Sequence, residues 1–279
     1  MPERIDVRKT YKLFLGGEFP RSESGRSFEV TDSKGDFLAN AARGSRKDLR
    51  DAVKAARGAW GKWASATAYN RGQVLYRIAE MMETRRAELV SEVAAAEGKR
   101  GATKQVDEAV DTWVWYAGLA DKLTQIMGGL NPVAGPYFNL TAPEPTGVCG
   151  IVAPEAPSLS GLVGRIAPAL CGGNVVIALA SEAHPLPAIA LAECLATSDL
   201  PKGVASILTG HKAELTPWLA SHGDVDALDV SGLTSGELVD AERAGADNVK
   251  RIIKGNGARS PYQASAFMEM KTVWHPKGA

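Results

Sequence analysis

The stretch that decides the fold runs from residue 148 to residue 230. It opens with Val148-Cys149-Gly150-Ile151-Val152, an unbroken run of apolar residues and glycine. Further apolar runs lie at 174–178, 204–208, 225–230 and 249–253, and helical patterns lie between them at 162–170, 187–196 and 214–220. Continuous apolar runs are typical of strands that are buried on both faces of a sheet. Such strands alternating with helices predict an α/β fold with a doubly wound parallel sheet of about five strands.

A Rossmann-like sheet of this kind binds ligands beyond the carboxyl ends of its strands, at the point where the strand order reverses. The turns after Val152, Ala178, Leu208 and Val230 are therefore where we expect a site. No glycine-rich phosphate loop follows the first strand, because the Gly-Asn-Gly at 255–257 is too short and comes too late. The generic motifs thus predict a nucleotide-type fold without naming its chemistry.

The rest of the chain is organised around this sheet. We divide the sequence into an N-terminal strand and helical part, an edge strand, the Rossmann-like core and a C-terminal strand, at residues 1–134, 135–147, 148–261 and 262–279. Prolines interrupt the second part, which is typical of loops and edge strands. No internal repeat, low-complexity tract or flexible linker separates the parts.

The C-terminal part carries the alternation of a half-buried strand. Met268, Met270 and Trp274 fall on one face, and Glu269 and Lys271 fall on the other. A terminal strand must pair with an edge, either in this chain or in another one. We therefore expect an association strand whose apolar side chains fill pockets on a partner.

The composition excludes several classes of protein. Lys and Arg number 32 and Asp and Glu also number 32, so the formal net charge is zero, whereas a nucleic-acid footprint needs a basic excess. The first residues contain no apolar core of a signal peptide, and we expect a cytoplasmic protein without membrane contact. The four histidines offer no pair at metal-ligand spacing, which predicts no metal site. The three cysteines lie in apolar settings that favour buried thiols: Cys149, Cys171 and Cys194.

The order of the motifs resembles that of the aldehyde dehydrogenase superfamily across nearly the whole chain. The matching motifs are Pro-Thr-Gly-Val-Cys-Gly-Ile-Val-Ala-Pro at 145–154, Ile-Ala-Pro-Ala-Leu at 166–170, Gly-Asn-Val-Val at 173–176, Leu-Pro-Lys-Gly-Val at 200–204, Leu-Thr-Gly at 208–210 and Ser-Gly at 231–232. The resemblance implies an NAD-type fold and strands that extend sheets between subunits. After Ser260-Pro261 the chain passes within a few residues to the family's C-terminal oligomerisation strand. The chain therefore resembles a family member from which the catalytic domain has been excised and the two ends joined.

The sequence departs from this family where the chemistry should lie. The asparagine that stabilises the oxyanion corresponds to Ala156, the lysine that holds the ribose to Leu179, and a serine at the pyrophosphate to Leu233. The general-base glutamate corresponds to Gly255. The nucleophilic cysteine should follow that glycine, but no cysteine follows Cys194. We therefore expect no catalytic residue in this chain.

A remnant of the family's cofactor pocket is implied by five residues that still match it: Ser181, Glu182, Gly210, Ser231 and Gly232. Because the ribose lysine and the phosphate serine are replaced by leucines, we expect no cofactor or only weak NAD(P) binding. Backbone amides near residues 231–232 remain able to attract an anion at the start of the following helix.

These observations predict a non-catalytic subunit, structural or regulatory, that assembles with itself or with a complete aldehyde dehydrogenase. The first alternative is an NAD-binding subunit of an NAD(P)-dependent aldehyde dehydrogenase whose catalytic thiol comes from a partner chain. A second alternative is a small-molecule sensor that uses the old cleft. The ribose and pyrophosphate contacts distinguish the first alternative from the main hypothesis.

Overall fold

The structure, a computed structural model, describes residues 8–278. Its centre is a five-stranded sheet in the order β10-β9-β6-β7-β8, and all neighbouring strands run parallel. The strands are β6 (Val148–Val152), β7 (Val175–Leu179), β8 (Ala205–Leu208), β9 (Ala227–Asp229) and β10 (Arg251–Ile253). Each coincides with one of the apolar runs, and every residue of β6, β7, β8 and β9 is buried. The predicted α/β fold with a doubly wound parallel sheet is confirmed.

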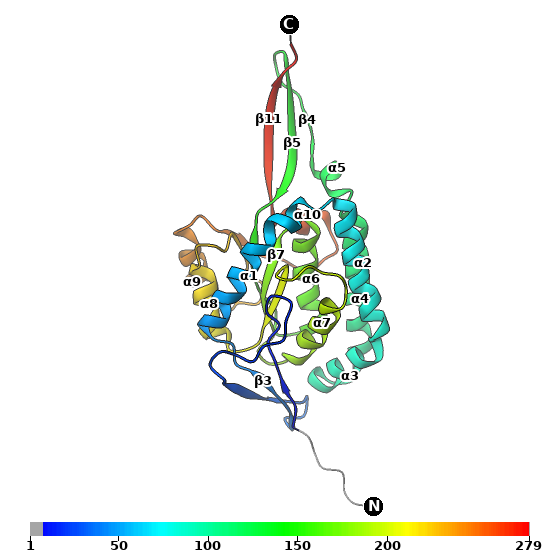
Figure 1. The fold of residues 1–279 in the computed structure, drawn as a ribbon, viewed down its shortest axis with the longest axis vertical. Coiled ribbons are helices and arrows are strands. Elements are labelled where there is room, and N and C mark those ends of the chain that lie inside the picture. The colour runs from blue at the N-terminus through cyan, green and yellow to red at the C-terminus, as the bar shows by residue number, and fades with distance from the viewer. Residues whose placement is uncertain (1–7, 279) are drawn as a thin grey trace, which may run out of the picture.

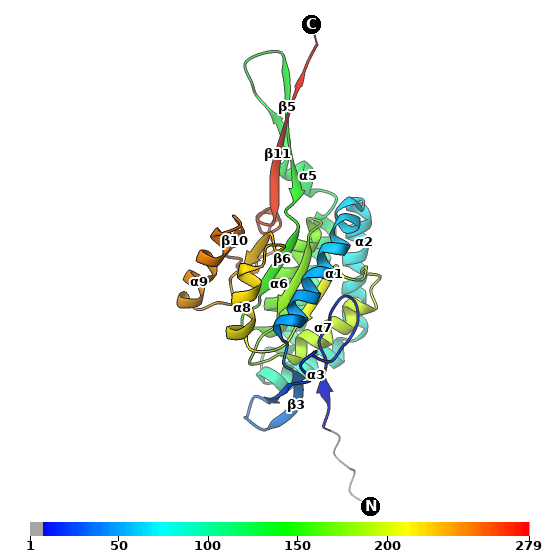
Figure 2. The same cartoon turned by 60° about the vertical axis from the view of Figure 1, so that its left-hand side comes forward.

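Helices cover both faces of this sheet (Figures 1 and 2). One face packs against α6 (Ser158–Cys171) and α7 (Leu186–Ala196), and the other packs against α1 (Arg46–Ser65) and α8 (Lys212–Ser221). A second layer lies outside α6 and α7 and consists of α2 (Ala68–Thr84), α3 (Arg86–Glu97) and α4 (Ala102–Leu119). The helix α9 (Ser235–Ala246) packs against α8 and β10. None of the helices within residues 8–278 is both long and apolar enough to cross a membrane.

The N-terminal part packs into the same hydrophobic core as the five-stranded sheet. A small sheet in the order β1-β3-β2 consists of β1 (Thr10–Tyr11), β2 (Ser27–Thr31) and β3 (Phe37–Ala42). The following helix α1 begins with a capping box, in which the Ser45 hydroxyl accepts from the Asp48 N–H and the Asp48 carboxylate accepts from the Ser45 N–H. This cap fixes the start of α1, whose buried face lies against β7. The domain boundaries drawn from the sequence stay a prediction.

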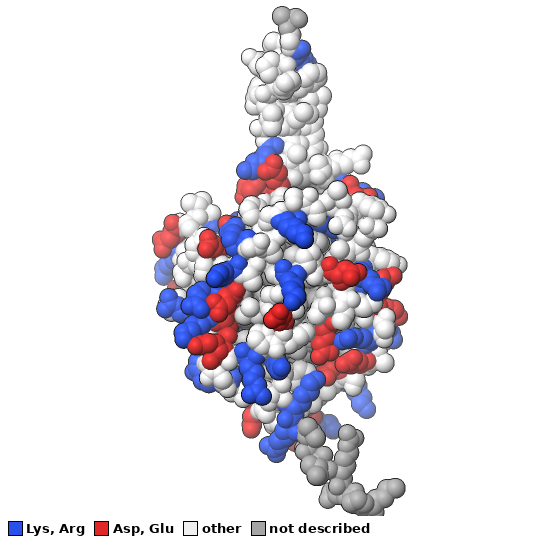
Figure 3. Space-filling view, in the orientation of Figure 1, with Lys and Arg blue, Asp and Glu red and all other residues white. Residues whose placement is uncertain are grey.

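A three-stranded arm projects from the body (Figures 1 and 2). We define the arm as residues 129–145 and 268–276; it contains β4 (Gly129–Asn131), β5 (Tyr137–Pro145) and β11 (Met268–Pro276) in the order β11-β5-β4. The short helices α5 (Leu123–Met127) and α10 (Pro261–Ser265) precede β4 and β11 along the chain. The strand β11 pairs antiparallel with β5 over its whole length, so the terminal strand finds an edge within its own chain. Charged side chains are sparse on the face of the arm that Figure 3 shows.

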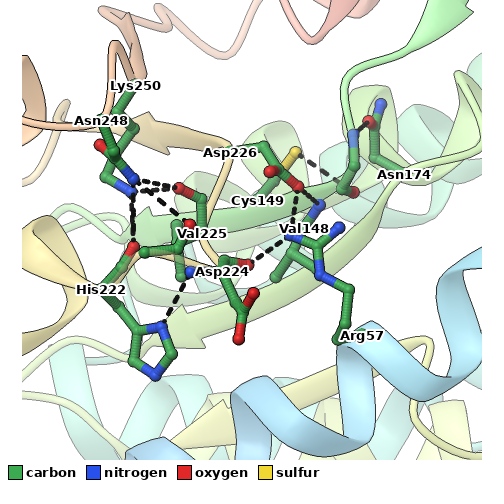
Figure 4. A network of polar contacts seen from close by, with 12 residues as sticks. Arg57, Val148, Cys149, Asn174, His222, Asp224, Val225, Asp226, Asn248 and Lys250 are labelled. Atoms are coloured by element: carbon green, nitrogen blue, oxygen red, sulfur yellow. Dashed lines mark hydrogen bonds and ion pairs between the residues drawn. The ribbon is translucent and has the colours of Figure 1, made fainter.

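A polar network at the amino ends of the strands joins the sheet to α1 and to the base of the arm (Figure 4). One carboxylate oxygen of Asp226 accepts from the Val148 N–H at 2.7 Å and from the Arg57 guanidinium of α1 at 2.8 Å. Asn174 accepts from the Gly147 N–H at 2.9 Å and donates to the Phe267 carbonyl at 2.9 Å, which ties β6 to the base of the arm. A Cβ at Gly147, whose φ is +140°, would lie 2.0 Å from the Asp226 carboxylate, so only glycine fits there.

The same network buries a lysine. Lys250 is 7% exposed, and its ammonium donates to the carbonyls of His222, at 3.0 Å, and Val225 (Figure 4). Burial lowers the pKa of Lys250 to about 8. The partners of the Lys250 ammonium at hydrogen-bond distance are neutral carbonyls, so keeping the ammonium charged costs free energy.

Candidate functional site

The candidate site lies at the carboxyl ends of the strands. The strand order reverses at β6, since β7 and β8 lie on one side of it and β9 and β10 on the other. The loops that follow β6, β7, β8 and β9 therefore converge at one edge of the sheet. These are the four turns that the sequence indicated.

Glu155 is the centre of one cluster at this edge. Its carboxylate accepts from the Ser181 hydroxyl at 2.9 Å and the Ala183 N–H at 2.9 Å, and it forms an ion pair with Lys212. Burial alone would raise the pKa of Glu155, but the Ala183 and Lys212 interactions outweigh it, and the pKa is lowered. Glu155 is therefore a carboxylate anchored inside the loop cluster.

Lys212, at the start of α8, joins Glu155 to the predicted pocket residue Glu182. The buried Lys212 ammonium donates to the Ala153 carbonyl at 2.5 Å, and the Lys212 backbone N–H donates to Glu182 at 2.9 Å. The Glu182 carboxylate also lies 2.6 Å from Nδ1 of His211. Three predicted pocket residues are thus brought together around the Glu155–Lys212 pair: Ser181, Glu182 and Gly210, which lies in the turn before His211.

The other two predicted pocket residues follow β9. The Ser231 hydroxyl donates to the Asp229 carboxylate at 2.5 Å and accepts from Nε of Arg165 at 2.9 Å. The Gly232 N–H donates to the Val152 carbonyl at 3.0 Å, so it points into the sheet. The pKa of Asp229 is raised because the carboxyl is buried, although the Ser231 hydrogen bonds oppose this shift. The Ser231 hydroxyl and the Gly232 N–H are therefore already engaged in hydrogen bonds within the protein.

The amino end of α9 also carries its own carboxylate. Glu237 accepts from the Thr234 N–H at 2.9 Å and from the Thr234 hydroxyl at 2.7 Å. These hydrogen bonds lower the pKa of Glu237. A helix amino end is a favourable place for a phosphate, but here a side-chain carboxylate already lies against it.

These contacts do not fit a dinucleotide. At the ribose position that the resemblance implies, the Leu179 side chain is buried and has no donor. At the pyrophosphate position that the resemblance implies, Leu233 packs against the core, and the Glu237 carboxylate would repel a phosphate placed at the amino end of α9. A dinucleotide would have to displace charge-assisted hydrogen bonds that the protein makes within itself.

The positions that the resemblance implies to be catalytic are equally altered. Ala156 borders a cavity but offers no donor to an oxyanion. A Cβ at Gly255 would lie 2.5 Å from Asp229 Oδ2 and 3.4 Å from the Arg165 side chain, so a glutamate cannot be restored there without moving Asp229. The cysteines are free and buried, and burial raises the pKa of each of them, to about 12 for Cys171 and about 11 for Cys194. A buried thiol of this kind is not an activated nucleophile.

Sequence reasoning missed the residues that fill the site: Glu155, Arg165, Lys212 and Glu237. The one available signal was an acidic residue, Glu155, placed three residues after a fully buried strand at the point of strand reversal. Within residues 8–278 no group of His, Cys, Asp or Glu is suited to hold a metal ion.

Comparison with known proteins gives a consistent result. The profile of the "Aldehyde dehydrogenase family" matches residues 19–272. "Aldehyde dehydrogenase, cytosolic 1" of Elephantulus edwardii is 33% identical over 267 residues, which cover 92% of this chain and 52% of that protein. "Retinal dehydrogenase 2" of Homo sapiens is 34% identical over 265 residues, which cover 92% of this chain and 50% of that protein.

Solved structures agree with the sequence comparison. HpcC from Thermus thermophilus superposes with a TM-score of 0.81 at 34% identity, over 88% of this chain and 47% of that one. The NAD+ complex of an aldehyde dehydrogenase from Bacillus cereus superposes with a TM-score of 0.81 at 27% identity, over 88% of this chain and 50% of that one. The chain thus spans about half the length of the proteins that it matches.

Proposed function

The chain belongs to the aldehyde dehydrogenase family, and we propose that within it this chain is a non-catalytic subunit that assembles with itself or with a complete aldehyde dehydrogenase. Its role is structural or regulatory. The observation that carries the proposal is the arm, which presents an apolar face to solvent.

The strand register places four exposed apolar side chains on one face of the arm. Leu140 of β5 lies opposite Val273 of β11 and opposite Leu130 of β4, and Phe138 lies two residues along β5 on the same face. The exposed fractions are 62% for Leu130, 43% for Phe138, 49% for Leu140 and 59% for Val273. We call these four residues the apolar face of the arm. Contiguous exposed apolar surface of this kind is typical of an interaction site.

The opposite face of the arm is stabilised within the chain. The Asn131 side chain donates to Asn139 at 2.6 Å and to Thr141 at 2.7 Å, and the hydroxyls of Thr141 and Thr272 lie 2.9 Å apart. These cross-strand contacts hold the arm in shape without a partner. A preformed arm lowers the entropic cost of association, because little ordering remains to be done on binding.

The edge of the arm offers a second means of association. Within the described residues, β11 pairs only with β5, so its outer edge carries backbone groups that no other strand satisfies. Such an edge accepts a strand from another chain through main-chain hydrogen bonds. Edge pairing and burial of the apolar face both support an oligomer.

The site supports the non-catalytic half of the proposal. The thiol, the oxyanion donor and the general base of the family have no counterpart among the described residues that line this edge, and only Ala266 and Phe267 separate α10 from β11. The alternative, an NAD-binding subunit with a borrowed thiol, is supported by the family's NAD+ complexes. The leucines Leu179 and Leu233 weigh against it, because they stand where the resemblance implies the ribose lysine and the pyrophosphate serine, and neither side chain can donate a hydrogen bond.

Light scattering of the purified chain tests the proposal. The unaltered chain should give a mass above that of one 29.5 kDa chain, alone or after addition of a complete aldehyde dehydrogenase. Deletion of residues 265–279 removes β11 and should yield monomers or aggregates. A deleted chain that keeps the native mass would show that the arm is not the assembly element.

A further inference from the structure

A cavity of about 660 Å³ opens beside the candidate site. It lies between α4, the amino end of α6, the loop after β6 and the loop after β10. Pro154, Ala156 and Pro157 form an apolar side of it, and the charged residues that line it are Glu108, Arg165 and Arg259. The cavity and its charges play no part in the proposed assembly.

The two charges at the rim are already matched. Glu108 pairs with Lys104 at 3.6 Å, one turn away on α4, and Arg259 pairs with Asp111 at 3.3 Å. All four side chains are at least 45% exposed, so solvent screens both pairs. The rim therefore adds little net charge to the cavity.

Arg165 differs from these residues because it is buried without an ion-pair partner. It is 9% exposed, and within residues 8–278 no carboxylate oxygen lies within 4.0 Å of its guanidinium nitrogens. Its hydrogen bonds go to neutral oxygens: the Ser231 hydroxyl at 2.9 Å, the Gly255 carbonyl at 3.2 Å and the Gly161 carbonyl at 3.5 Å. A guanidinium has about five N–H donors, so these three bonds leave donors over.

No neighbouring carboxylate pairs directly with Arg165, although Asp229 acts on it from beyond ion-pair distance. Asp229 is the nearest source, but it reaches Arg165 only through the Ser231 hydroxyl, and burial raises the pKa of Asp229. The amino end of α6 is taken, since Glu97 accepts from the Ser158 N–H at 2.8 Å. A Cβ at Gly257 would lie 2.3 Å from Arg165 Nη1, so the glycine leaves room for the guanidinium beside the cavity.

We propose that this cavity binds a small organic carboxylate, with Arg165 as its counter-charge and Pro154 and Pro157 against its apolar body. A buried cation without a direct ion-pair partner is costly, and a bound carboxylate lowers that cost. Guanidinium and carboxylate match in planar geometry and form short, charge-assisted hydrogen bonds. The proposal is independent of whether the arm assembles.

Calorimetric titration of the full chain with hexanoate, hexanamide and inorganic phosphate at constant ionic strength tests this proposal. Hexanoate should bind saturably, and the neutral hexanamide should bind about tenfold or more weakly, because it lacks the charge. Arg165→Met should lose hexanoate binding, and Arg243→Gln, which removes an exposed arginine on α9, should retain it. Phosphate should bind more weakly than hexanoate because it has no apolar body.

Four results would contradict carboxylate binding at Arg165. Equal affinity for hexanoate and hexanamide, no binding of hexanoate up to about 10 mM, or unchanged binding by Arg165→Met would each overturn the proposal. Tighter binding of phosphate than of hexanoate would overturn the carboxylate assignment. If Arg165→Met does not fold, which thermal unfolding detects, the hexanoate and hexanamide comparison on the unaltered chain decides the matter.

Discussion

The apolar face of the arm can be disrupted without disturbing the arm itself. Leu140 and Val273 are directly opposite each other in the β5–β11 register, and both are about half exposed. We therefore consider the double substitution Leu140→Lys with Val273→Glu. Opposite charges at directly opposed positions stabilise an antiparallel pair, so the arm should keep its shape while its apolar face becomes charged.

The magnitude follows from the exposed fractions. Burying a whole Leu or Val side chain contributes about 1.5–3 kcal/mol, so the half that is still exposed contributes about 1 kcal/mol for each residue. Two residues on each of two chains in a twofold interface give about 4 kcal/mol, which corresponds to an association constant about a thousandfold lower. The desolvation of the new charges adds to this loss.

Sedimentation equilibrium over a range of protein concentrations measures the effect. The double variant should be monomeric at concentrations where the unaltered chain is associated, and its circular dichroism should be unchanged. Val239→Glu is the matched control, because it places the same charge at a 43% exposed valine of α9, away from the arm. A double variant with the dissociation constant of the unaltered chain would refute the assignment of the interface to this face.

Three further predictions concern catalysis, the cofactor and pH. The isolated chain should form no NADH from simple aldehydes, and a rate that a single Cys→Ser substitution abolishes would contradict this. Calorimetry should find NAD affinity roughly a hundredfold or more below that of a complete family member, because the loss of two charge-assisted hydrogen bonds at about 1.5–3 kcal/mol each predicts it; a micromolar dissociation constant would refute it. Lys250, whose folded pKa is about 8, has an unfolded pKa of about 10.4, so the unfolded chain binds more protons between these values and the free energy of unfolding should rise with pH. Between about pH 7.5 and about pH 10, denaturant unfolding should show that the free energy of unfolding of the unaltered chain rises by up to about 3 kcal/mol more than that of Lys250→Met. The buried cysteines titrate in both proteins, so their opposing effect cancels in this comparison. Equal pH dependence of the two proteins would count against the buried charge.

The sheet was predictable from the sequence because its strands are buried on both faces. A run such as Val148–Val152 is apolar throughout, and nothing outside the run is needed to recognise it. The strand β4 was missed because its three residues are all exposed and lie between glycine and proline, so no burial pattern marks them. Local sequence therefore identifies an element where burial dictates every residue.

The arm shows what alternation alone cannot settle. Alternation along β11 indicated an apolar face with Met268, Met270 and Trp274. In the structure Met268 is buried at the base of the arm, and Trp274 lies on the face that carries the Asn and Thr contacts. Met270 and Trp274 are exposed on that face, and the opposite face carries a second apolar set, where Leu140 and Val273 meet. Its recognition needs the cross-strand register, which a single strand does not contain.

The sequence indicated where in the fold the candidate site should lie, but it did not reveal all the residues that fill it. The turns beyond the strand ends, and Ser181 and Glu182 among their residues, were found because strand order and family resemblance both indicate them. The ion pair of Glu155 with Lys212 joins residues 57 positions apart and depends on how two loops meet. No local pattern specifies such a contact, so the filling of the pocket by the protein's own charges could come only from the structure.

Whether this chain works as part of an assembly is decided by the native mass of the protein purified from its own host, with every chain in it identified by mass spectrometry. We expect a mass above 29.5 kDa, composed of several copies of this chain or of this chain with a complete aldehyde dehydrogenase. A single chain of 29.5 kDa, with no partner at any concentration measured, would contradict it.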